Sequence, residues 1–220
     1  MRIAVVGGSG QIARLLHPLL VAAGHQPVAL VRSESQRTAL EALGAEVRLL
    51  DIENSDVAGF ATAFAGCDAV VFSAGGGPDG NIDRKRTVDL EGSLKSSAAA
   101  QSLGIQRFVQ VSAIDVDNPV SPDAPAVWAA YVAAKRDADT ALRDSPLDWT
   151  ILRPGRLTDD PPTGRVALGP SVARGDVTRA DVAAVVAAVV GDARTVGRQW
   201  NLVGGDVPVA EAVAAAVSAS

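Results

Sequence analysis

The sequence predicts an α/β protein built on a doubly wound parallel sheet, with one layer of helices on each face of the sheet. Short apolar, β-branched runs alternate along the chain with longer segments of helical periodicity. The runs are apolar at successive positions, which is typical of parallel strands buried on both faces. Glycines and polar residues follow these runs directly. Repeated strand–helix alternation therefore predicts three layers, α/β/α, with right-handed crossovers and a ligand site at the carboxyl ends of the strands.

Length, composition and charge restrict the class of protein. The 220 residues are 48% hydrophobic, which suits a single domain over residues 1–220, with residues 156–220 contributing a small cover on the substrate side. The net charge of −5 argues against a nucleic-acid partner. Met1 leads straight into a strand, which leaves no room for a targeting peptide. The longest apolar run, Val182–Val190, is about half as long as a membrane span. We therefore expect a cytoplasmic protein that does not enter a membrane.

Cysteine and histidine are scarce. Cys67 is the one cysteine, which excludes an internal disulfide, and its place just before a strand favours a buried apolar role. His17 and His25 fall in the first helix and the turn after it, without further soft ligands nearby. The sequence therefore predicts no metal site.

The first strand, Ile3–Val6, leads into a glycine-rich turn and then a helix. Gly7 permits a tight turn, Gly10 lets the backbone approach a phosphate, and Ala13 lets the helix pack close to the sheet. Backbone N–H groups and a helix N-terminus at such a turn can hold a pyrophosphate. A short glycine pattern also occurs for purely structural reasons, so its strand–turn–helix context carries the argument. We expect cofactor contacts from Gly7, Ser9, Gly10, Gln11 and Ile12.

The second strand, Val28–Val31, ends at Arg32. In a βαβ unit an acidic residue here would accept the adenosine ribose 2′-hydroxyl, whereas an arginine pairs with a 2′-phosphate. Ser33 and Arg37 follow within a helical turn. NADP is therefore favoured over NAD as the cofactor. The alternative is a surface arginine without a ligand.

The third and fourth strands, 47–50 and 69–72, supply further cofactor contacts. Asp51 and Ile52 could receive the adenine amino group and cover the adenine face, although Asp51 could equally cap the next helix. Three glycines after the fourth strand let the backbone pass close to a second part of the ligand. From this loop we expect contacts by Ala74, Gly75 and Gly76.

The remaining elements continue the alternation. We expect helices at 39–43, 57–64, 83–103, 127–143 and 209–217, strands at 108–111, 149–152 and 201–203, a short strand near Val166, and a helix that opens at Thr178 with Asp181 placed for a capping box. Ser112 follows the strand at 108–111, and Pro154 and Gly155 follow the strand at 149–152. These three residues share the ligand-binding edge of the predicted sheet.

The one tyrosine in the chain, Tyr131, stands four residues before Lys135 within a predicted helix. Residues at this spacing lie on one helical face. The Lys135 ammonium is then expected to stabilise the tyrosinate and to lower the pKa of Tyr131 below about 10. Ser112 could bond and orient the same substrate oxygen. Without a nucleotide site, Tyr131 is more simply a half-buried aromatic, Lys135 its solvated neighbour and Ser112 a strand-end cap.

Five segments together resemble the atypical short-chain dehydrogenase/reductases, in the NAD(P)H-binding branch related to biliverdin reductase B and the sugar epimerase/dehydratases. They are Gly-Gly-Ser-Gly-Gln-Ile-Ala (7–13), Val-Gln-Val-Ser (109–112), Tyr-Val-Ala-Ala-Lys (131–135), Leu-Asp-Trp-Thr-Ile-Leu-Arg-Pro-Gly (147–155) and Thr-Arg-Ala-Asp-Val-Ala (178–183). The resemblance covers nearly the whole chain and implies a Rossmann fold that binds NAD(P).

By this resemblance Ser112, Tyr131 and Lys135 occupy the catalytic positions, and Lys135 also contacts the nicotinamide ribose. Pro154 and Gly155 match the loop beside the nicotinamide. Asp89 stands where many relatives have a catalytic asparagine, which puts the ordered proton relay in doubt. The branch contains reductases, isomerases and regulatory NADP sensors, so the resemblance does not identify a substrate.

Three functions therefore stand as hypotheses. The first is an NADP(H)-dependent oxidoreductase that acts on a small carbonyl, quinone or flavin-like molecule. The second is a non-catalytic NADP(H)-binding sensor that regulates a partner. The third is a sugar epimerase or dehydratase, which expects a larger C-terminal domain with arginines that bind a pyrophosphate. The candidate arginines for the third are Arg153, Arg156, Arg165 and Arg174. The sequence indicates neither the substrate nor the oligomeric state.

Overall fold

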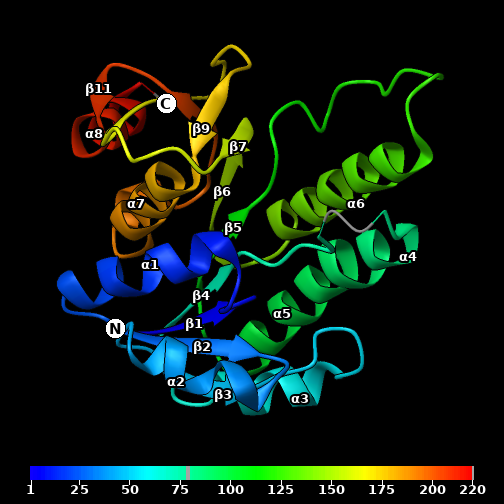
Figure 1. Ribbon diagram of the computed structural model, residues 1–220, viewed down its shortest axis with the longest axis vertical. Coiled ribbons are helices and arrows are strands. Elements are labelled where there is room, and N and C mark those ends of the chain that lie inside the picture. The colour runs from blue at the N-terminus through cyan, green and yellow to red at the C-terminus, as the bar shows by residue number, and fades with distance from the viewer. Residues whose placement is uncertain (78–79, 220) are drawn as a thin grey trace.

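The computed structural model describes residues 1–77 and 80–219, and within them the expected doubly wound α/β fold is confirmed (Figure 1). The main sheet has the strand order β11-β8-β10-β6-β5-β4-β1-β2-β3. All neighbours from β3 across to β10 are parallel, whereas β8 is antiparallel to both β10 and β11. A second, two-stranded sheet joins β7 to β9 in parallel.

The strands are β1 (Arg2–Val6), β2 (Gln26–Val31), β3 (Glu46–Leu49), β4 (Ala69–Phe72), β5 (Arg107–Val111), β6 (Asp148–Pro154), β7 (Arg156–Thr158), β8 (Arg165–Gly169), β9 (Asp176–Thr178), β10 (Arg198–Gly204) and β11 (Val207–Pro208). The α-helices are α1 (Gln11–Ala22), α2 (Arg37–Glu41), α3 (Val57–Phe64), α4 (Ile82–Arg84), α5 (Glu91–Ser102), α6 (Ala126–Arg143), α7 (Arg179–Val190) and α8 (Val209–Ser218). A π-helical turn, η2 (Lys85–Leu90), joins α4 to α5, and 3-10 turns lie at η1 (Glu34–Gln36) and η3 (Ala193–Thr195).

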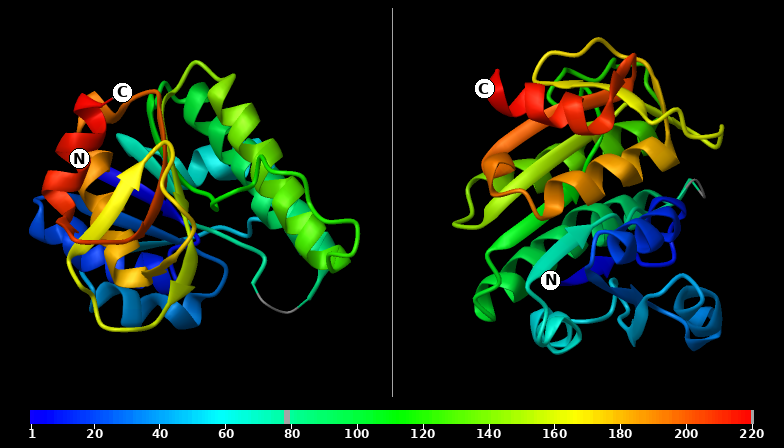
Figure 2. Two further views of the ribbon diagram at one scale, coloured as in Figure 1. Left: turned by 90° about the horizontal axis from the view of Figure 1, so that it is seen from above. Right: turned by 90° about the vertical axis from the view of Figure 1, so that its left-hand side faces the viewer.

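The helices form two layers because alternate strand residues face opposite sides of the sheet. Ile3 and Val5 of β1 pack with α1, α7 and α8, and α2 packs on the same side against β2. Ala4 and Val6 face the opposite way and pack with α3, α5 and α6. Figure 1 shows α1, α7 and α8 on the left of the sheet and α5 and α6 on the right, and the view from above in Figure 2 separates the same layers.

The strand order reverses between β1 and β4. In open parallel sheets, ligands bind outside the carboxyl ends of the strands at such a switch point. The turn after β1 and the loop after β4 meet here, since a Cβ atom on Gly7 would lie 2.8 Å from the Cα atom of Ala74. The topology therefore places the predicted ligand edge at these two loops.

The structure also differs from the expected elements. The helix expected at 83–103 runs from Ile82 to Ser102 but contains the π-helical turn. Much of residues 156–220 extends the main sheet through β8, β10 and β11, and α7 packs on α1. Thr178 caps α7 as expected, but the Asp181 carboxylate accepts from Gly164 N at 2.8 Å instead of completing a capping box. Apolar periodicity did not predict these long-range contacts.

No helix within residues 1–77 and 80–219 combines the length and apolarity that crossing a bilayer requires.

Arg107, the first residue of the central strand β5, ties the amino end of that strand to the end of α7. Its guanidinium donates to the carbonyl oxygens of Asp148, Val189 and Val190 at 2.8, 2.7 and 3.0 Å, and to Thr195 Oγ1 at 2.8 Å. Burial lowers the pKa of Arg107 to about 10. Arg107 remains charged at neutral pH because this value is well above 7.

We expect Arg107→Ala to lower the free energy of unfolding by about 3 kcal/mol, because it leaves several buried acceptors without their charged donor. Urea unfolding followed by circular dichroism measures the change. Arg136→Ala is the control, because the Arg136 side chain is 43% exposed and pairs with its neighbour Asp137, and it should change stability by less than about 0.5 kcal/mol. Equal effects of the two variants would contradict the role given to Arg107.

Candidate functional site

The turn after β1 has the backbone geometry of a phosphate cradle. Gly7 has φ +78°, which disfavours a side chain, and Gly8 packs so closely on β2 that a Cβ atom would lie 2.8 Å from the Cα atom of Ala29. Gly10 caps α1 and has no side chain to bond the first-turn N–H groups of the helix. An anion at this end would bind those N–H groups and the positive end of the helix dipole. The residues present therefore fit a dinucleotide pyrophosphate.

A pocket of about 270 Å³ continues from this turn along the ends of β1, β2, β3 and β4. Nine predicted cofactor residues line it: Gly7, Ser9, Gly10, Arg32, Ser33, Asp51, Ile52, Ala74 and Gly75. Eight more residues line it that were not predicted: Leu30, Val31, Gln36, Leu50, Glu53, Ser73, Arg84 and Val88. The pocket therefore brings together four strand ends that are distant in the sequence.

Two of the predicted residues of the first turn differ in what they can offer. The Gln11 side chain is exposed, whereas the Ile12 side chain is 8% exposed and packs into the apolar core. Only the backbone of Ile12 can therefore face a ligand.

Arg32 and Arg37 have different surroundings. Arg32 lines the pocket and its side chain is 69% exposed. Arg37 lies outside the pocket lining and bonds Glu34, Glu41 and the carbonyl oxygen of Val47. The structure therefore brings Arg32, but not Arg37, to the expected position for a 2′-phosphate.

Asp51 closes the turn after β3. One carboxylate oxygen accepts from the N–H groups of Glu53 and Asn54 at 3.0 and 3.2 Å, and the other accepts from Asn54 Nδ2 at 2.9 Å. The Asn54 side-chain bond holds the pKa of Asp51 below its usual range. Asp56 caps α3 by accepting from Gly59 N at 2.9 Å, so the alternative role of Asp51 as a cap of that helix is wrong.

The loop after β4 packs against η2. A Cβ atom on Gly76 would lie 2.8 Å from the carbonyl oxygen of Arg84, so backbone packing accounts for this glycine. Gly75 lines the pocket, and a Cβ atom added to Gly75 would lie 3.2 Å from Asp89 Oδ1. Gly76 N donates to Asp89 Oδ2 at 2.8 Å. Asp89 therefore fixes the loop by a hydrogen bond, and the lack of side chains on Gly75 and Gly76 allows the close packing.

Lys135 and Asp89 form a buried ion pair. Lys135 Nζ lies 3.1 Å from Asp89 Oδ1, and the two side chains are 6% and 0% exposed. Lys135 also donates to the carbonyl oxygens of Ala74 and Val111 at 3.4 and 3.3 Å. Burial acts to lower the pKa of Lys135, but the Asp89 charge raises it, and the net direction is upward. Lys135 is thus a cation fixed between the ends of β4 and β5.

Tyr131 lies one helical turn before Lys135 on α6. Lys135 Nζ is 5.9 Å from the Tyr131 ring centroid, and the ring of Trp128 is 5.5 Å away, centroid to centroid. Burial raises the pKa of Tyr131 above its ordinary value, and the opposing effect of Lys135 is smaller. The expectation that Lys135 brings this pKa below about 10 is therefore wrong in this structure, because burial and the Asp89 charge outweigh the ammonium.

Ser112 belongs to a buried polar network centred on Asp139. Ser112 Oγ donates to Asp139 Oδ2 at 2.8 Å, Gln110 Nε2 donates to Oδ1 at 2.7 Å, and Arg153 Nε donates to Oδ2 at 2.8 Å. Arg153 also bonds Asp117. A hydroxyl has one proton, so Ser112 is left only acceptor capacity toward a ligand in this arrangement.

Pro154 and Gly155 lie at the end of β6 and directly after it, on the ligand edge but outside the pocket lining. A Cβ atom on Gly155 would lie 1.9 Å from the carbonyl oxygen of Gly175, so close backbone packing requires this glycine. Pro154 O accepts from Ile114 N at 2.9 Å.

Sequence reasoning did not predict Asp139, Glu53 or Arg84, nor Lys85, whose Nζ atom lies 6.0 Å from the Tyr131 ring centroid. Asp139 follows Lys135 by four residues and so lies on the same helical face, which is a signal that could have found it. The other three depend on how the loops after β3 and β4 fold. Within the described part of the chain, no group of three His, Cys, Asp or Glu side chains is placed to hold a metal ion.

The fold and the position of the pocket define a nucleotide-binding Rossmann-like protein. The family model described as NAD(P)H-binding matches residues 7–193, and the chain belongs to that family.

Two similar proteins cover almost the full length of the chain. "Uncharacterized sugar epimerase YhfK" of Bacillus subtilis is 39% identical over 97% of this chain and 99% of its own. The structure described as "Putative NAD-dependent epimerase/dehydratase" from Bacillus halodurans is 39% identical, covers 98% of this chain and 99% of its own, and has a TM-score of 0.91. The anaerobilin reductase ChuY from Escherichia coli O157:H7 shares the fold, with 24% identity over 94% of this chain and 98% of its own and a TM-score of 0.76.

Because Tyr131 is the one tyrosine in the chain, tyrosinate absorbance reports on this site alone. We expect Lys135→Met to raise the pKa of Tyr131 further, by about one unit, because the opposing positive charge is removed. A pH titration of ultraviolet absorbance measures the shift. Lys135→Arg keeps the positive charge, so the Tyr131 pKa should stay close to its wild-type value. Arg136→Gln is the control, because it removes a charge from a partly exposed neighbour. An unchanged Tyr131 pKa in Lys135→Met would show that the two side chains are not electrostatically coupled.

Proposed function

We propose that this protein is an NADP(H)-dependent oxidoreductase that reduces a small carbonyl, quinone or flavin-like acceptor. The observation that carries the proposal is the position of Tyr131 and Lys135. Lys135 bonds the strand-end carbonyl of Ala74, which itself lines the nucleotide pocket, and Tyr131 lies one turn away on the same helix. A proton donor and a nucleotide site are thus joined through one lysine.

Tyr131 has the protonation state that a reduction needs. Its pKa lies above the ordinary value, so the phenol keeps its proton throughout the neutral range. It can therefore donate that proton to an acceptor oxygen that gains negative charge, while the buried Lys135 ammonium favours the tyrosinate left behind. Asp89 keeps Lys135 charged and in place, which is the use we assign to the aspartate at this position.

The cofactor would supply the hydride, and the chain would hold it. We assign the pyrophosphate to the turn Gly7–Gly10, the adenosine 2′-phosphate to Arg32, and the nicotinamide ribose to Lys135, with Pro154 and Gly155 beside the nicotinamide. Arg32 supports NADP over NAD because a guanidinium matches a phosphate better than a hydroxyl. Trp128 is 42% exposed and packs against Tyr131, so it offers a planar acceptor an aromatic surface at the proton donor.

A redox-sensing role is the second candidate, because Ser112 donates its one proton to Asp139. A site in which this serine cannot donate to a substrate could bind nucleotide without turning over. The sugar epimerase or dehydratase activity named for two relatives receives less support from the side chains. Arg153 is bonded to Asp139 and Asp117, and Arg156 pairs with Asp176, so two of the arginines considered for a sugar nucleotide pyrophosphate already have carboxylate partners.

The test is NADPH oxidation against a panel of quinones, flavins and aldehydes. We expect Tyr131→Phe to lower kcat for an accepted substrate by about 10²–10⁴-fold while NADPH affinity stays unchanged, because only the proton donor is lost. Calorimetry with NADPH is the control for binding. Unchanged turnover in Tyr131→Phe would remove this residue from the mechanism. NADPH binding without turnover of any acceptor, together with different affinities for NADP⁺ and NADPH, would favour the sensor.

A further inference from the structure

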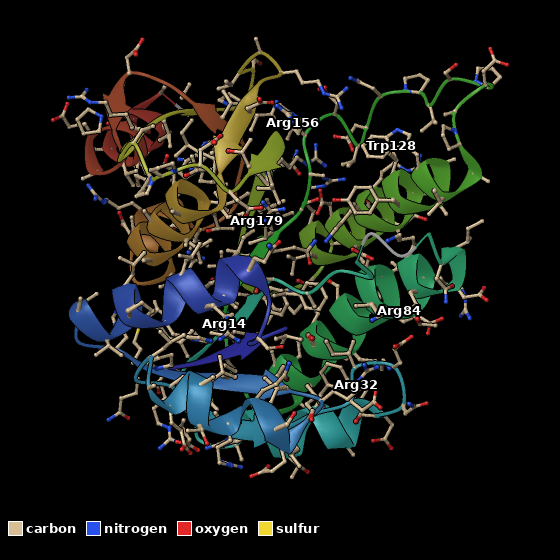
Figure 3. The ribbon with its side chains drawn as sticks, in the orientation of Figure 1. Arg14, Arg32, Arg84, Trp128, Arg156 and Arg179 are labelled. Atoms are coloured by element: carbon tan, nitrogen blue, oxygen red, sulfur yellow. The ribbon has the colours of Figure 1, made fainter. Side chains whose placement is uncertain are left out.

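A carboxylate lies within the pocket, at a position that the proposed mechanism does not use. Glu53 lies in the turn after β3 and lines the pocket together with Arg32 and Arg84. Its Oε2 atom lies 3.4 Å from Arg84 Nε and 3.9 Å from Arg32 Nη1. Its Oε1 atom accepts from Thr87 Oγ1 at 2.9 Å. The four side chains come from the ends of β2 and β3, from α4 and from η2, and Figure 3 labels the two arginines.

The three charged groups are not held equally. The side chains of Glu53 and Arg84 are 26% and 32% exposed, whereas that of Arg32 is 69% exposed and has the longer ion-pair distance. Glu53 is thus anchored by Arg84 and Thr87, and Arg32 is bound loosely at its edge. A loosely paired, exposed guanidinium can exchange one anionic partner for another at little cost.

Neighbouring acids do not occupy this position. The Asp51 carboxylate accepts from the turn that it closes, and Glu34 bonds Arg37, which lies outside the pocket lining. Glu53 is therefore the carboxylate that forms ion pairs with both pocket arginines. Because Asp51 lines the pocket as well, the two guanidinium groups of the pocket are balanced by two carboxylates.

We propose that Glu53 is a specificity-determining residue that limits the preference of this pocket for a 2′-phosphorylated dinucleotide. The inference rests on the proposed function, in which Arg32 receives the 2′-phosphate of NADP. That phosphate must replace Glu53 as the partner of Arg32 and bind beside the carboxylate, with which it shares negative charge. A 2′-hydroxyl of NAD meets no such repulsion. Glu53 therefore keeps the affinities for NADP and NAD closer than two arginines alone would.

The experiment measures NADP⁺ and NAD⁺ binding to the full chain by titration calorimetry. We expect Glu53→Gln to raise the ratio of the NAD⁺ Kd to the NADP⁺ Kd by about tenfold, mainly through tighter NADP⁺ binding. Glu34→Gln is the matched control, because it removes the same charge from an acid that pairs with Arg37, and it should change the ratio by less than about twofold. Circular dichroism verifies that each variant is folded.

A second variant tests whether Arg32 carries the effect. Arg32→Gln should weaken NADP⁺ binding. In the Arg32→Gln background, Glu53→Gln should raise the ratio of the NAD⁺ Kd to the NADP⁺ Kd by less than it does in the wild-type background, because the effects of coupled residues are not additive. High salt should screen these charges and so reduce the rise in the Kd ratio that Glu53→Gln causes.

Three results would overturn the inference. An unchanged ratio in Glu53→Gln would make Glu53 a structural residue, and a selective loss of NAD⁺ binding would make it a ribose acceptor. Binding of neither nucleotide to the wild-type protein would refute the proposed function and the inference with it. The first two results leave NADP binding intact, so failure of the inference is distinguishable from failure of the proposed function.

Discussion

The buried contact between Lys135 and Asp89 connects the parts of the site. It joins α6 to η2, and the same two side chains bond the loop after β4 through Ala74 and Gly76. Burying an ammonium or a carboxylate without a charged partner costs much free energy. Each of these two side chains can therefore be buried in its charged form only because the other is present. The glycines of the loop matter because they allow the backbone to come this close. Nucleotide pocket and tyrosine are thereby fixed relative to one another by one ion pair.

Charged groups at the two ends of the candidate site differ in exposure. Around Tyr131, Lys135 pairs with Asp89 and Asp139 pairs with Arg153, and Lys85 Nζ lies 6.0 Å from the Tyr131 ring centroid. At the outer end of the pocket, Arg32 and Arg84 pair with Glu53, and Asp51 lines the same pocket. The Lys135 and Asp89 side chains are 6% and 0% exposed, whereas that of Arg32 is 69% exposed. An anionic ligand can therefore reach Arg32, while the inner end offers a protonated phenol.

Much of the fold followed from patterns that local physics controls. Strands buried on both faces show as apolar runs, and the strand at 69–72 and the helix at 57–64 match the structure at every residue. Gly7, Arg32 and Ala74 were expected at one edge of the sheet because parallel strand ends share it, and all three line the pocket there. The pairing of Asp89 with Lys135 was not predictable, because nothing in the sequence marks which distant side chains meet. Glu53 was missed for the same reason, since only the fold of the turn after Asp51 directs it into the pocket.

The π-helical turn Lys85–Leu90 has a consequence for how this protein family could diversify. Such a turn behaves as one residue inserted into an otherwise regular helix, and each residue of an α-helix advances the side-chain direction by about 100°. The segment before the insertion, with Arg84, faces the nucleotide pocket, and the segment after it continues as α5 against α3 and α6. A descendant that lost one residue here would keep α5 packed while rotating Arg84 away from the pocket. Insertion or deletion of a single codon could thus change ligand choice without disturbing the core.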